Sequence, residues 1–324
     1  MTSLLEVRDL RVSFPVGGGR TIHPVDGVSF TLERGRTLAL VGESGCGKSL
    51  TGLALLRLVP SPGRVEASSV IRLDGKDLLS FNEEEMREVR GGRIGMVFQD
   101  PMTSLNPVLA IGDQIGEAVR AHRKVSRGEA LSRAESLLSE VGIADPSRRL
   151  REYPHQLSGG MRQRVMIAIA LAAEPEILIA DEPTTALDVT VQAQILELLD
   201  RLRSQHGMAV LLITHDLGVV AGRADDMCVM YAGQVVEHAS TRQVFEAPAH
   251  PYTRGLFGSV PTITGPRERL TPIAGSVPPP TAWPTGCRFA PRCPERFDRC
   301  DTMPPLRRAA PGHESRCWLT GDEP

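Results

Sequence analysis

The chain has 324 residues, of which 41% are hydrophobic and 23% charged, a balance that can fill a sizeable globular core. Its formal net charge of -2 gives no electrostatic footprint for nucleic acid, so we expect no nucleic-acid partner. The first ten residues lack the apolar run of a signal peptide, and no stretch approaches the roughly 18 apolar residues of a membrane span. We therefore expect a cytosolic protein that reaches the membrane only through partners.

The first part of the chain alternates short apolar runs with helical patterns, which predicts an α/β fold. Residues 37–41, 176–180 and 209–214 are apolar runs typical of buried strands. Between the last two runs, apolar residues recur at helical spacing and Gly207 follows as a C-terminal cap. This strand–helix–strand order predicts a parallel sheet.

Residues 106–175 have mostly helical patterns, with an amphipathic stretch at 129–140 and a helix opened by Ser158. We interpret this region as a helical subdomain inserted between strands of the core. Beyond residue 245 prolines accumulate and strong periodicity disappears. The predicted domains are therefore 1–245 and a C-terminal extension, 246–324.

The strongest chemical signal is a phosphate-binding loop directly after the strand at 37–41. Glycines let the main chain curl so that its N–H groups face phosphate oxygens, and the following helix presents its positive end to the same anion. Lys48 is predicted to contact the β and γ phosphates, and the hydroxyl of Ser49 to hold Mg²⁺. The predicted ATP-binding residues of the loop are Gly42, Ser44, Gly45, Cys46, Gly47, Lys48, Ser49 and Leu50.

A second signal is the apolar run at 177–180 that ends in two carboxylates. Asp181 is placed to hold Mg²⁺ through water, and Glu182 to act as the base for the attacking water. Acidic strand ends are common in proteins, so this pair of carboxylates indicates a nucleotide site only in combination with the phosphate-binding loop.

A third signal is the segment 157–164, which reads LSGGMRQR. A helix start with a capping serine and two glycines is a second phosphate-binding surface, or a plain capped helix. The segment resembles the signature motif of ABC ATPases, and other family motifs follow in the family's order. Gln99 matches the Q-loop, residues 186–188 with Asp188 match the D-loop, His215 matches the H-loop, and Phe14 matches the aromatic residue that stacks on adenine.

The resemblance implies a P-loop NTPase (RecA-like) core with an antiparallel β subdomain and an inserted α-helical subdomain. It implies catalytic roles for Glu182, His215 and Gln99, and a Mg²⁺ ion held through Ser49, Gln99 and Asp181. It further implies that Ser158, Gly159 and Gly160 clamp the γ-phosphate of ATP bound to a partner ATPase.

Within the ABC proteins, the chain is most similar to the ATPases of oligopeptide and dipeptide importers, through residues 157–171 and the segment HPYTRGL at 250–256. This resemblance implies two membrane permease subunits, a second and distinct ABC ATPase, an extracytoplasmic solute-binding protein, and a peripheral location at the cytoplasmic face of the membrane. Importers of nickel or other small solutes, exporters and non-transport ABC ATPases are the alternatives.

Four cysteines crowd the C-terminal extension: Cys287, Cys293, Cys300 and Cys317. Their spacings of five, six and sixteen intervening residues contain none of the close pairs usual in zinc modules, which favours a [4Fe–4S] cluster, with Zn²⁺ or free or disulfide-bonded thiols as alternatives. In some members of the importer branch a similar tail binds an iron–sulfur cluster. For Cys46, in the phosphate-binding loop, we expect sensitivity to oxidants.

Overall fold

The computed structural model of the protein describes residues 3–185, 187–259 and 272–321. The chain forms two compact units: unit 1 comprises residues 1–33, 37–79 and 213–324, and unit 2 comprises residues 34–36 and 80–212. Both units combine helices with strands, as the α/β prediction required. No helix in the described parts of the chain is long and apolar enough to span a membrane.

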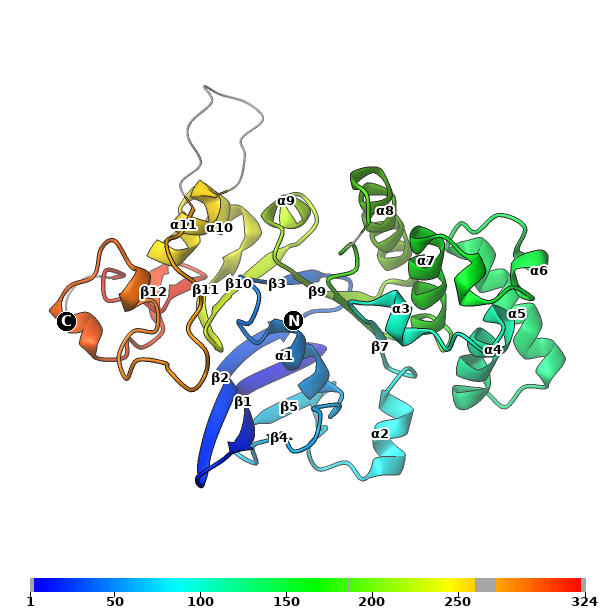
Figure 1. Cartoon of the computed structure of the whole chain (residues 1–324), viewed down its shortest axis with the longest axis horizontal. Coiled ribbons are helices and arrows are strands. Elements are labelled where there is room, and N and C mark those ends of the chain that lie inside the picture. Colours follow the sequence, from blue (N-terminus) through cyan, green and yellow to red (C-terminus); the bar gives the residue numbers. More distant parts are fainter. Residues whose placement is uncertain (1–2, 186, 260–271, 322–324) are drawn as a thin grey trace. The chain divides into compact units, whose positions relative to one another are not determined.

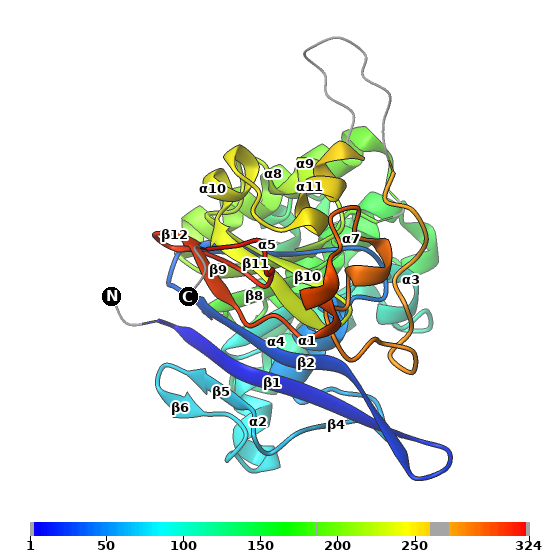
Figure 2. The same cartoon turned by 90° about the vertical axis from the view of Figure 1, so that its left-hand side faces the viewer.

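An antiparallel sheet occupies the N-terminal part of unit 1, with two long strands side by side (Figure 2). The turn between these strands contains Gly18 and Gly19 with φ angles of 77° and 71°, which glycine adopts without steric cost. The strand order is β2-β1-β5-β6, and β4 pairs with β1. The strands are β1 (Leu5–Val16), β2 (Arg20–Leu32), β4 (Arg64–Val65), β5 (Val70–Leu73) and β6 (Lys76–Asp77).

Five further strands of unit 1 pair in the order β12-β13-β11-β10-β3, as part of an eight-stranded sheet. They are β3 (Thr37–Val41), β10 (Asp226–Tyr231), β11 (Gln234–Ser240), β12 (Arg307–Ala310) and β13 (His313–Ser315). All five residues of β3 are buried, as expected for a strand that is parallel to its neighbour, here β10, and covered on both faces. Strand β13 pairs with β11, so the C-terminal extension adds two strands to the sheet that carries the phosphate-binding loop (Figure 1).

The helices of unit 1 are short. They are α1 (Lys48–Leu55), α9 (Leu217–Val220), α10 (Thr241–Glu246) and α11 (Pro251–Gly258), with 3₁₀ turns η2 (Ala290–Arg292) and η3 (Asp298–Asp301). Helix α11 begins with proline, whose missing N–H costs nothing at the first helical position.

Strand β8 (Ile177–Asp181) lies between β7 (Ile94–Val97) and β9 (Ala209–Thr214), of which all but the last two residues of β9 belong to unit 2. Strands β7 and β8 are parallel, and Ile94 is in register with Ile177. Helix α8 (Val189–His206) connects β8 to β9 and is followed by Gly207 in the left-handed region, with φ 62°. The predicted strand–helix–strand pattern and its glycine cap are therefore confirmed, with β8 one residue later than expected.

Helices α3 to α7 of unit 2 follow one another between β7 and β8 and gather in one region of Figure 1, whereas α2 precedes β7 and lies apart from them. Helix α5 starts two residues earlier than predicted because Ser126 and Glu129 form a capping box. The elements are α2 (Glu83–Val89), α3 (Pro101–Ser104), α4 (Ile111–His122), α5 (Arg127–Glu140), α6 (Pro146–Arg149), η1 (Pro154–Gln156) and α7 (Gly159–Ala170), of which α2 precedes β7.

Candidate active site

The phosphate-binding loop joins β3 to α1 in unit 1, as predicted. Two of its glycines are required by the backbone. Gly42 has φ 156°, and a Cβ there would lie 2.2 Å from the carbonyl oxygen of Met230. Gly47 has φ 95°, and a Cβ there would lie 2.5 Å from the carbonyl oxygen of Pro24. Only glycine fits either position, so the loop has the close-packed shape of an anion cradle.

The loop is open at its tip and closed at its base. Ser44 and Gly45 are exposed, and a Cβ on Gly45 would meet nothing within 4 Å. Among the described residues, no side chain caps α1 at Gly47, which leaves the positive end of this helix to an anion. Ser49 and Leu50 lie in the first turn of the helix.

The ammonium group of Lys48 is buried with the loop, since the residue is 5% exposed. Its Nζ donates hydrogen bonds to the carbonyl oxygens of Gly42, at 2.7 Å, and Glu43, at 3.0 Å. A buried cation needs such partners, and both come from the loop itself. The charge is thus held at the loop that the sequence assigned to phosphate binding.

Cys46 is fully buried in the loop, and burial raises the pKa of its thiol. The nucleophilic and oxidisable form of cysteine is the thiolate. The structure therefore argues against the expected sensitivity of Cys46 to oxidants.

We expect Cys46 to react with iodoacetamide far more slowly in the folded protein than in guanidinium chloride, because the thiol is both buried and protonated. Mass spectrometry of the peptide that contains Cys46 measures this, with the half-buried Cys293 as an internal comparison. Equal rates for Cys46 in the folded and unfolded chain would contradict the assignment.

Phe14 and His215 are the other predicted nucleotide residues of unit 1. Phe14 lies on β1, and its ring packs against Gly63 so closely that a Cβ there would approach the ring to 2.4 Å. His215 is exposed directly after β9. Next to it, Asp216 caps α9 by accepting a hydrogen bond from the N–H of Gly218 at 2.8 Å.

In unit 2 the structure brings two predicted catalytic residues together at the end of β8. Glu182 has φ 45°, a left-handed conformation that is uncommon outside glycine, asparagine and aspartate. Gln99 Nε2 donates a hydrogen bond to Glu182 Oε2 at 3.1 Å, and Thr185 Oγ1 donates to the same oxygen at 2.8 Å. Asp181, the last residue of β8, is 5% exposed. Strained backbone of this kind is concentrated at functional sites.

Thr185 was not singled out from the sequence. It orients the Glu182 carboxylate from three residues further along the chain, a spacing typical of turns. Its only signal in the sequence is its place three residues after the carboxylate at the end of β8. That position indicates a contact only once the left-handed backbone of Glu182 is known.

The signature segment forms the start of α7, as predicted. Ser158 is the N-cap, and its Oγ accepts a hydrogen bond from the N–H of Met161 at 3.3 Å. Ser158 and Gly159 are exposed. A Cβ on Gly160 would lie 2.7 Å from a methyl group of Val191, so this glycine also allows α7 to pack near the start of α8.

Asp188, the predicted D-loop residue, is the N-cap of α8 and accepts a hydrogen bond from the N–H of Val191 at 3.0 Å. Ala186, in the same predicted motif, lies outside the described residues. The structure thus gives Asp188 a capping role, and its D-loop role stays a prediction.

The four cysteines of the extension do not form the predicted metal site. They line one small pocket together with aromatic side chains, among them Phe289, Phe297 and Trp318. All four are free thiols, and no group of three or more His, Cys, Asp or Glu side chains in the described part of the chain is arranged to hold a metal ion. The predicted [4Fe–4S] cluster, and its zinc alternative, are therefore wrong.

Burial in this pocket raises the pKa of Cys287 and Cys293, and it raises the pKa of Cys317 to about 11. Neutral thiols are therefore favoured in the pocket. Spacing along the chain predicted that the four thiols gather, but it carried no information on whether they ionise.

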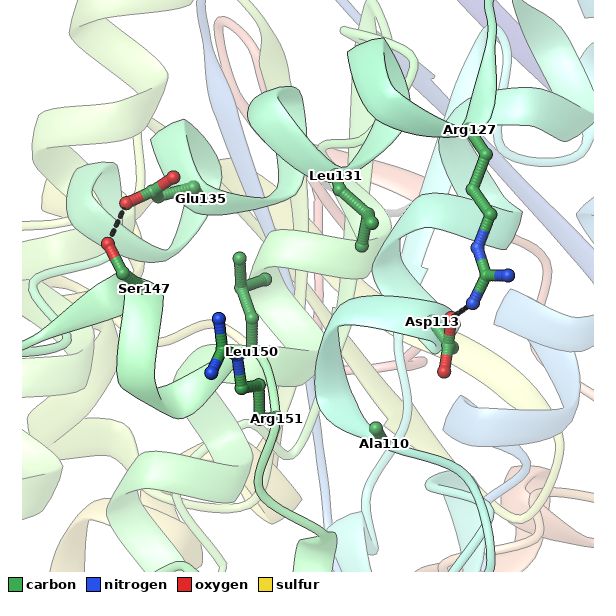
Figure 3. Close-up of a pocket in the computed structure, with 8 residues that line it drawn as sticks. All are labelled: Ala110, Asp113, Arg127, Leu131, Glu135, Ser147, Leu150 and Arg151. Atoms are coloured by element: carbon green, nitrogen blue, oxygen red, sulfur yellow. Dashed lines mark hydrogen bonds and ion pairs between the residues drawn. The ribbon is translucent and has the colours of Figure 1, made fainter.

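A separate pocket of about 440 Å³ lies among α4, α5 and α6 of unit 2 (Figure 3). Arg127 and Asp113 form an ion pair at 3.0 Å on one side of it, and Ser147 is hydrogen-bonded to Glu135 on the other. The residues that line the pocket are Ala110, Asp113, Arg127, Leu131, Glu135, Ser147, Leu150 and Arg151. None of these residues belongs to the predicted nucleotide site, so we assign no role in ATP hydrolysis to this pocket.

Comparison with known proteins decides the family. Residues 25–185 match the model of the family described as ABC transporter, and residues 236–300 match the model described as oligopeptide/dipeptide transporter, C-terminal region. The chain is 52% identical over 324 residues to the oligopeptide transport ATP-binding protein AppD of Bacillus subtilis (strain 168), covering 100% of this chain and 98% of that protein. This chain belongs to the oligopeptide/dipeptide ABC transporter ATPases.

Other relatives agree with this assignment. The ABC ATPase is 51% identical over 320 residues to the dipeptide transport ATP-binding protein DppD of Bacillus subtilis (strain 168), covering 98% of this chain and 95% of that protein. The solved dimeric structure of MJ0796, a bacterial ABC transporter cassette, has a TM-score of 0.65 at 27% identity and covers 74% of this chain and 99% of its own. The structure of cbiO1 from Clostridium perfringens has a TM-score of 0.64 at 28% identity, and the match covers 76% of this chain and 92% of cbiO1.

These findings confirm three predictions: the ABC family with its oligopeptide/dipeptide branch, the ATPase activity, and the ABC cassette fold. They favour the peptide transporter over the nickel and non-transport alternatives.

Proposed function

We propose that this ABC ATPase hydrolyses ATP to drive the uptake of oligopeptides or dipeptides through membrane permease subunits. The observation that carries the proposal is the hydrogen bond from Gln99 to Glu182, which joins a nucleotide-sensing side chain to a candidate base. It occurs in a chain whose relatives are named oligopeptide and dipeptide transport ATP-binding proteins. We take the cargo, oligopeptides or dipeptides, from the names of these relatives.

The residues of the loop fit a magnesium nucleotide. The two glycines that exclude a Cβ form the cradle for the phosphates, and Lys48 supplies the cation. Ser49 of the loop, together with Gln99 and Asp181 elsewhere in the chain, would hold Mg²⁺ through their hydroxyl, amide and carboxylate oxygens, and the ion would offset negative charge on the phosphates. Phe14 supplies a ring for the adenine.

In hydrolysis, we assign Glu182 as the base. Its carboxylate takes a proton from water while the water oxygen attacks the γ-phosphorus, and the bond from that phosphorus to the ADP oxygen breaks. Gln99 and Thr185 hold the Glu182 carboxylate in one orientation. His215 is assigned to the γ-phosphate side of the same nucleotide.

The signature residues act on a second ATPase subunit. Ser158, Gly159 and Gly160 at the exposed start of α7 would contact the γ-phosphate of ATP bound by the partner, and Asp188 would lie at the same interface. ATP then stabilises the closed pair through contacts that ADP lacks, and hydrolysis removes them. The partner is a related but distinct ABC ATPase.

The proposed assembly also contains two permease subunits and an extracytoplasmic solute-binding protein. The chain lies at the cytoplasmic face of the membrane and binds it peripherally through the permeases. Its domains are 1–245, with an antiparallel β subdomain and a helical subdomain at about 106–175, and the extension 246–324, which holds prolines and four free thiols.

Reconstitution tests this function. The chain, its partner ATPase and the two permeases are placed in proteoliposomes, and Mg·ATP hydrolysis is measured with the solute-binding protein loaded with a peptide library. We expect peptide-loaded binding protein to stimulate hydrolysis and labelled peptide to accumulate. Stimulation by a nickel chelate in place of peptides would overturn the assignment of cargo, and absence of Mg·ATP hydrolysis would overturn the function itself.

A further inference from the structure

The C-terminal extension touches the phosphate-binding loop through Tyr252, the third residue of the segment HPY. The N–H of Glu43, in the loop, donates a hydrogen bond to the Tyr252 hydroxyl at 2.9 Å. The buried thiol of Cys46, also in the loop, lies close to the same hydroxyl. Tyr252 is fully buried, so its phenol reaches the loop from a helix outside the ATP-binding segment.

The contact controls one particular peptide group. The peptide between Gly42 and Glu43 donates its N–H to Tyr252 and accepts a hydrogen bond from Lys48 Nζ at its carbonyl oxygen, at 2.7 Å. Rotation of this peptide would break both bonds. Tyr252 therefore keeps the carbonyl that holds the Lys48 ammonium facing into the loop.

A second residue of the extension, Arg292, binds the side chain of Glu43. Its two terminal nitrogens reach the two carboxylate oxygens of Glu43, each at 3.0 Å. The Arg292 side chain is 6% exposed, and its Nε donates to the carbonyl oxygen of Ala274 at 2.8 Å. Bidentate pairs of this kind are strong and fix geometry as well as distance.

Tyr252 is itself held firmly. The His250 Nδ1 accepts a hydrogen bond from the N–H of Tyr252 at 3.0 Å, while the N–H of His250 donates to the buried carboxylate of Glu237 at 2.9 Å. Burial lowers the pKa of His250 to about 3, so its Nδ1 is an acceptor at neutral pH. The ring of Tyr252 packs on Tyr231 and Phe289, with centroids 4.6 and 5.4 Å apart. Aromatic residues are only 4% of the chain, so their gathering here marks a rigid support.

We propose that the C-terminal extension preorganises the phosphate-binding loop, with Tyr252 and Arg292 as positioning residues for Mg·ATP. A glycine-rich loop loses much conformational freedom when it closes on a nucleotide, and contacts made beforehand lower that cost. The loop is held here at its backbone by Tyr252 and at its Glu43 side chain by Arg292. The inference rests on the proposed ATP-binding function and adds that the extension supports that site.

The first test compares Tyr252→Phe with Tyr231→Phe. Both remove one phenol hydroxyl from the same buried aromatic cluster, but the Tyr231 hydroxyl contacts Arg292 only at 3.5 Å and no loop atom in the described contacts. We expect Tyr252→Phe to raise the KM and Kd for Mg·ATP by about threefold to tenfold, one hydrogen bond's worth, with kcat nearly unchanged. Tyr231→Phe should weaken Mg·ATP binding much less than Tyr252→Phe does, because it removes only the 3.5 Å contact with Arg292.

The second test uses Arg292→Met, with Arg296→Met as the matched control on the same segment, because the side chain of Arg296 forms an exposed ion pair with Asp301 and contacts no described residue of the loop. Affinity for a fluorescent ATP analogue should fall by about tenfold for Arg292→Met and recover in part for Arg292→Lys, which keeps the charge. Glu43→Gln combined with Arg292→Met should lose no more affinity than either change alone.

Thermal unfolding of each variant separates local from global effects, and all binding is measured below the onset of unfolding. Unchanged Mg·ATP affinity in folded Tyr252→Phe and Arg292→Met, while the unaltered protein binds, would overturn the inference and leave the proposed function standing. Failure of the unaltered protein to bind Mg·ATP would overturn the proposed function, and this inference with it.

Discussion

Replacing Glu182 with Gln should lower kcat for ATP hydrolysis by about a hundredfold to ten-thousandfold while Mg·ATP still binds. An amide keeps the shape of the side chain and its contacts with Gln99 and Thr185, but it does not accept the proton of the attacking water. Single-turnover hydrolysis and equilibrium binding of a fluorescent nucleotide measure the two effects separately. We also expect the variant to hold the two ATPase subunits together for longer, because ATP persists between them.

Glu174→Gln is the matched control for this change. Glu174 lies in the same unit, has the same left-handed backbone with φ 58°, and forms ion pairs with Arg123 and Arg133 at 2.9 and 3.0 Å. The control therefore removes one negative charge from a residue with the same backbone conformation and leaves the proposed base unchanged. Full turnover by Glu182→Gln, or an equal loss of turnover in both variants, would refute the role of Glu182.

Replacing Gly47 with Ala should weaken Mg·ATP binding by about tenfold or more. The new Cβ would lie 2.5 Å from the carbonyl oxygen of Pro24, and alanine is strained at φ 95°. Because Gly47 directly precedes Lys48 and the first turn of α1, any shift there moves both the cation and the helix N-terminus away from the phosphates. Isothermal titration with Mg·ATP measures the loss.

Gly18→Ala separates the backbone cost from the steric clash. Gly18 has φ 77° in the β1–β2 turn, and a Cβ there would meet nothing within 4 Å. The control should lose some free energy of unfolding through its backbone, with nucleotide affinity unchanged. If Gly47→Ala binds Mg·ATP as tightly as Gly18→Ala does, the loop is not the closely packed cradle that we describe.

The sequence predicted the elements of the site well because their signals are local. The run at 37–41 became β3 without change, and Ser158 became the N-cap of α7. Each depends on a few neighbouring residues: β-branched and aliphatic side chains for a buried strand, a serine hydroxyl for the free N–H groups of a helix start.

The cysteines of the extension are the part of the chain for which local sequence signals gave the wrong prediction. Four thiols in a proline-rich tail predict a metal site from the sequence, yet the four cysteines lie among aromatic rings as free thiols. Whether a thiol ionises depends on burial and nearby charge. This property does not follow from spacing along the chain.

Residue type and short spacing account for the chemistry of the site: the glycines and Lys48 of the loop, the carboxylates at 181–182, and the signature at 157–161. Which distant residues act on that chemistry follows from the folded structure alone. Tyr252 and Arg292 stand about two hundred residues or more beyond Glu43, yet both bind it. The physical reason is that hydrogen bonds act over about 3 Å in space, and only the folded sheet brings the C-terminal extension that close to the loop.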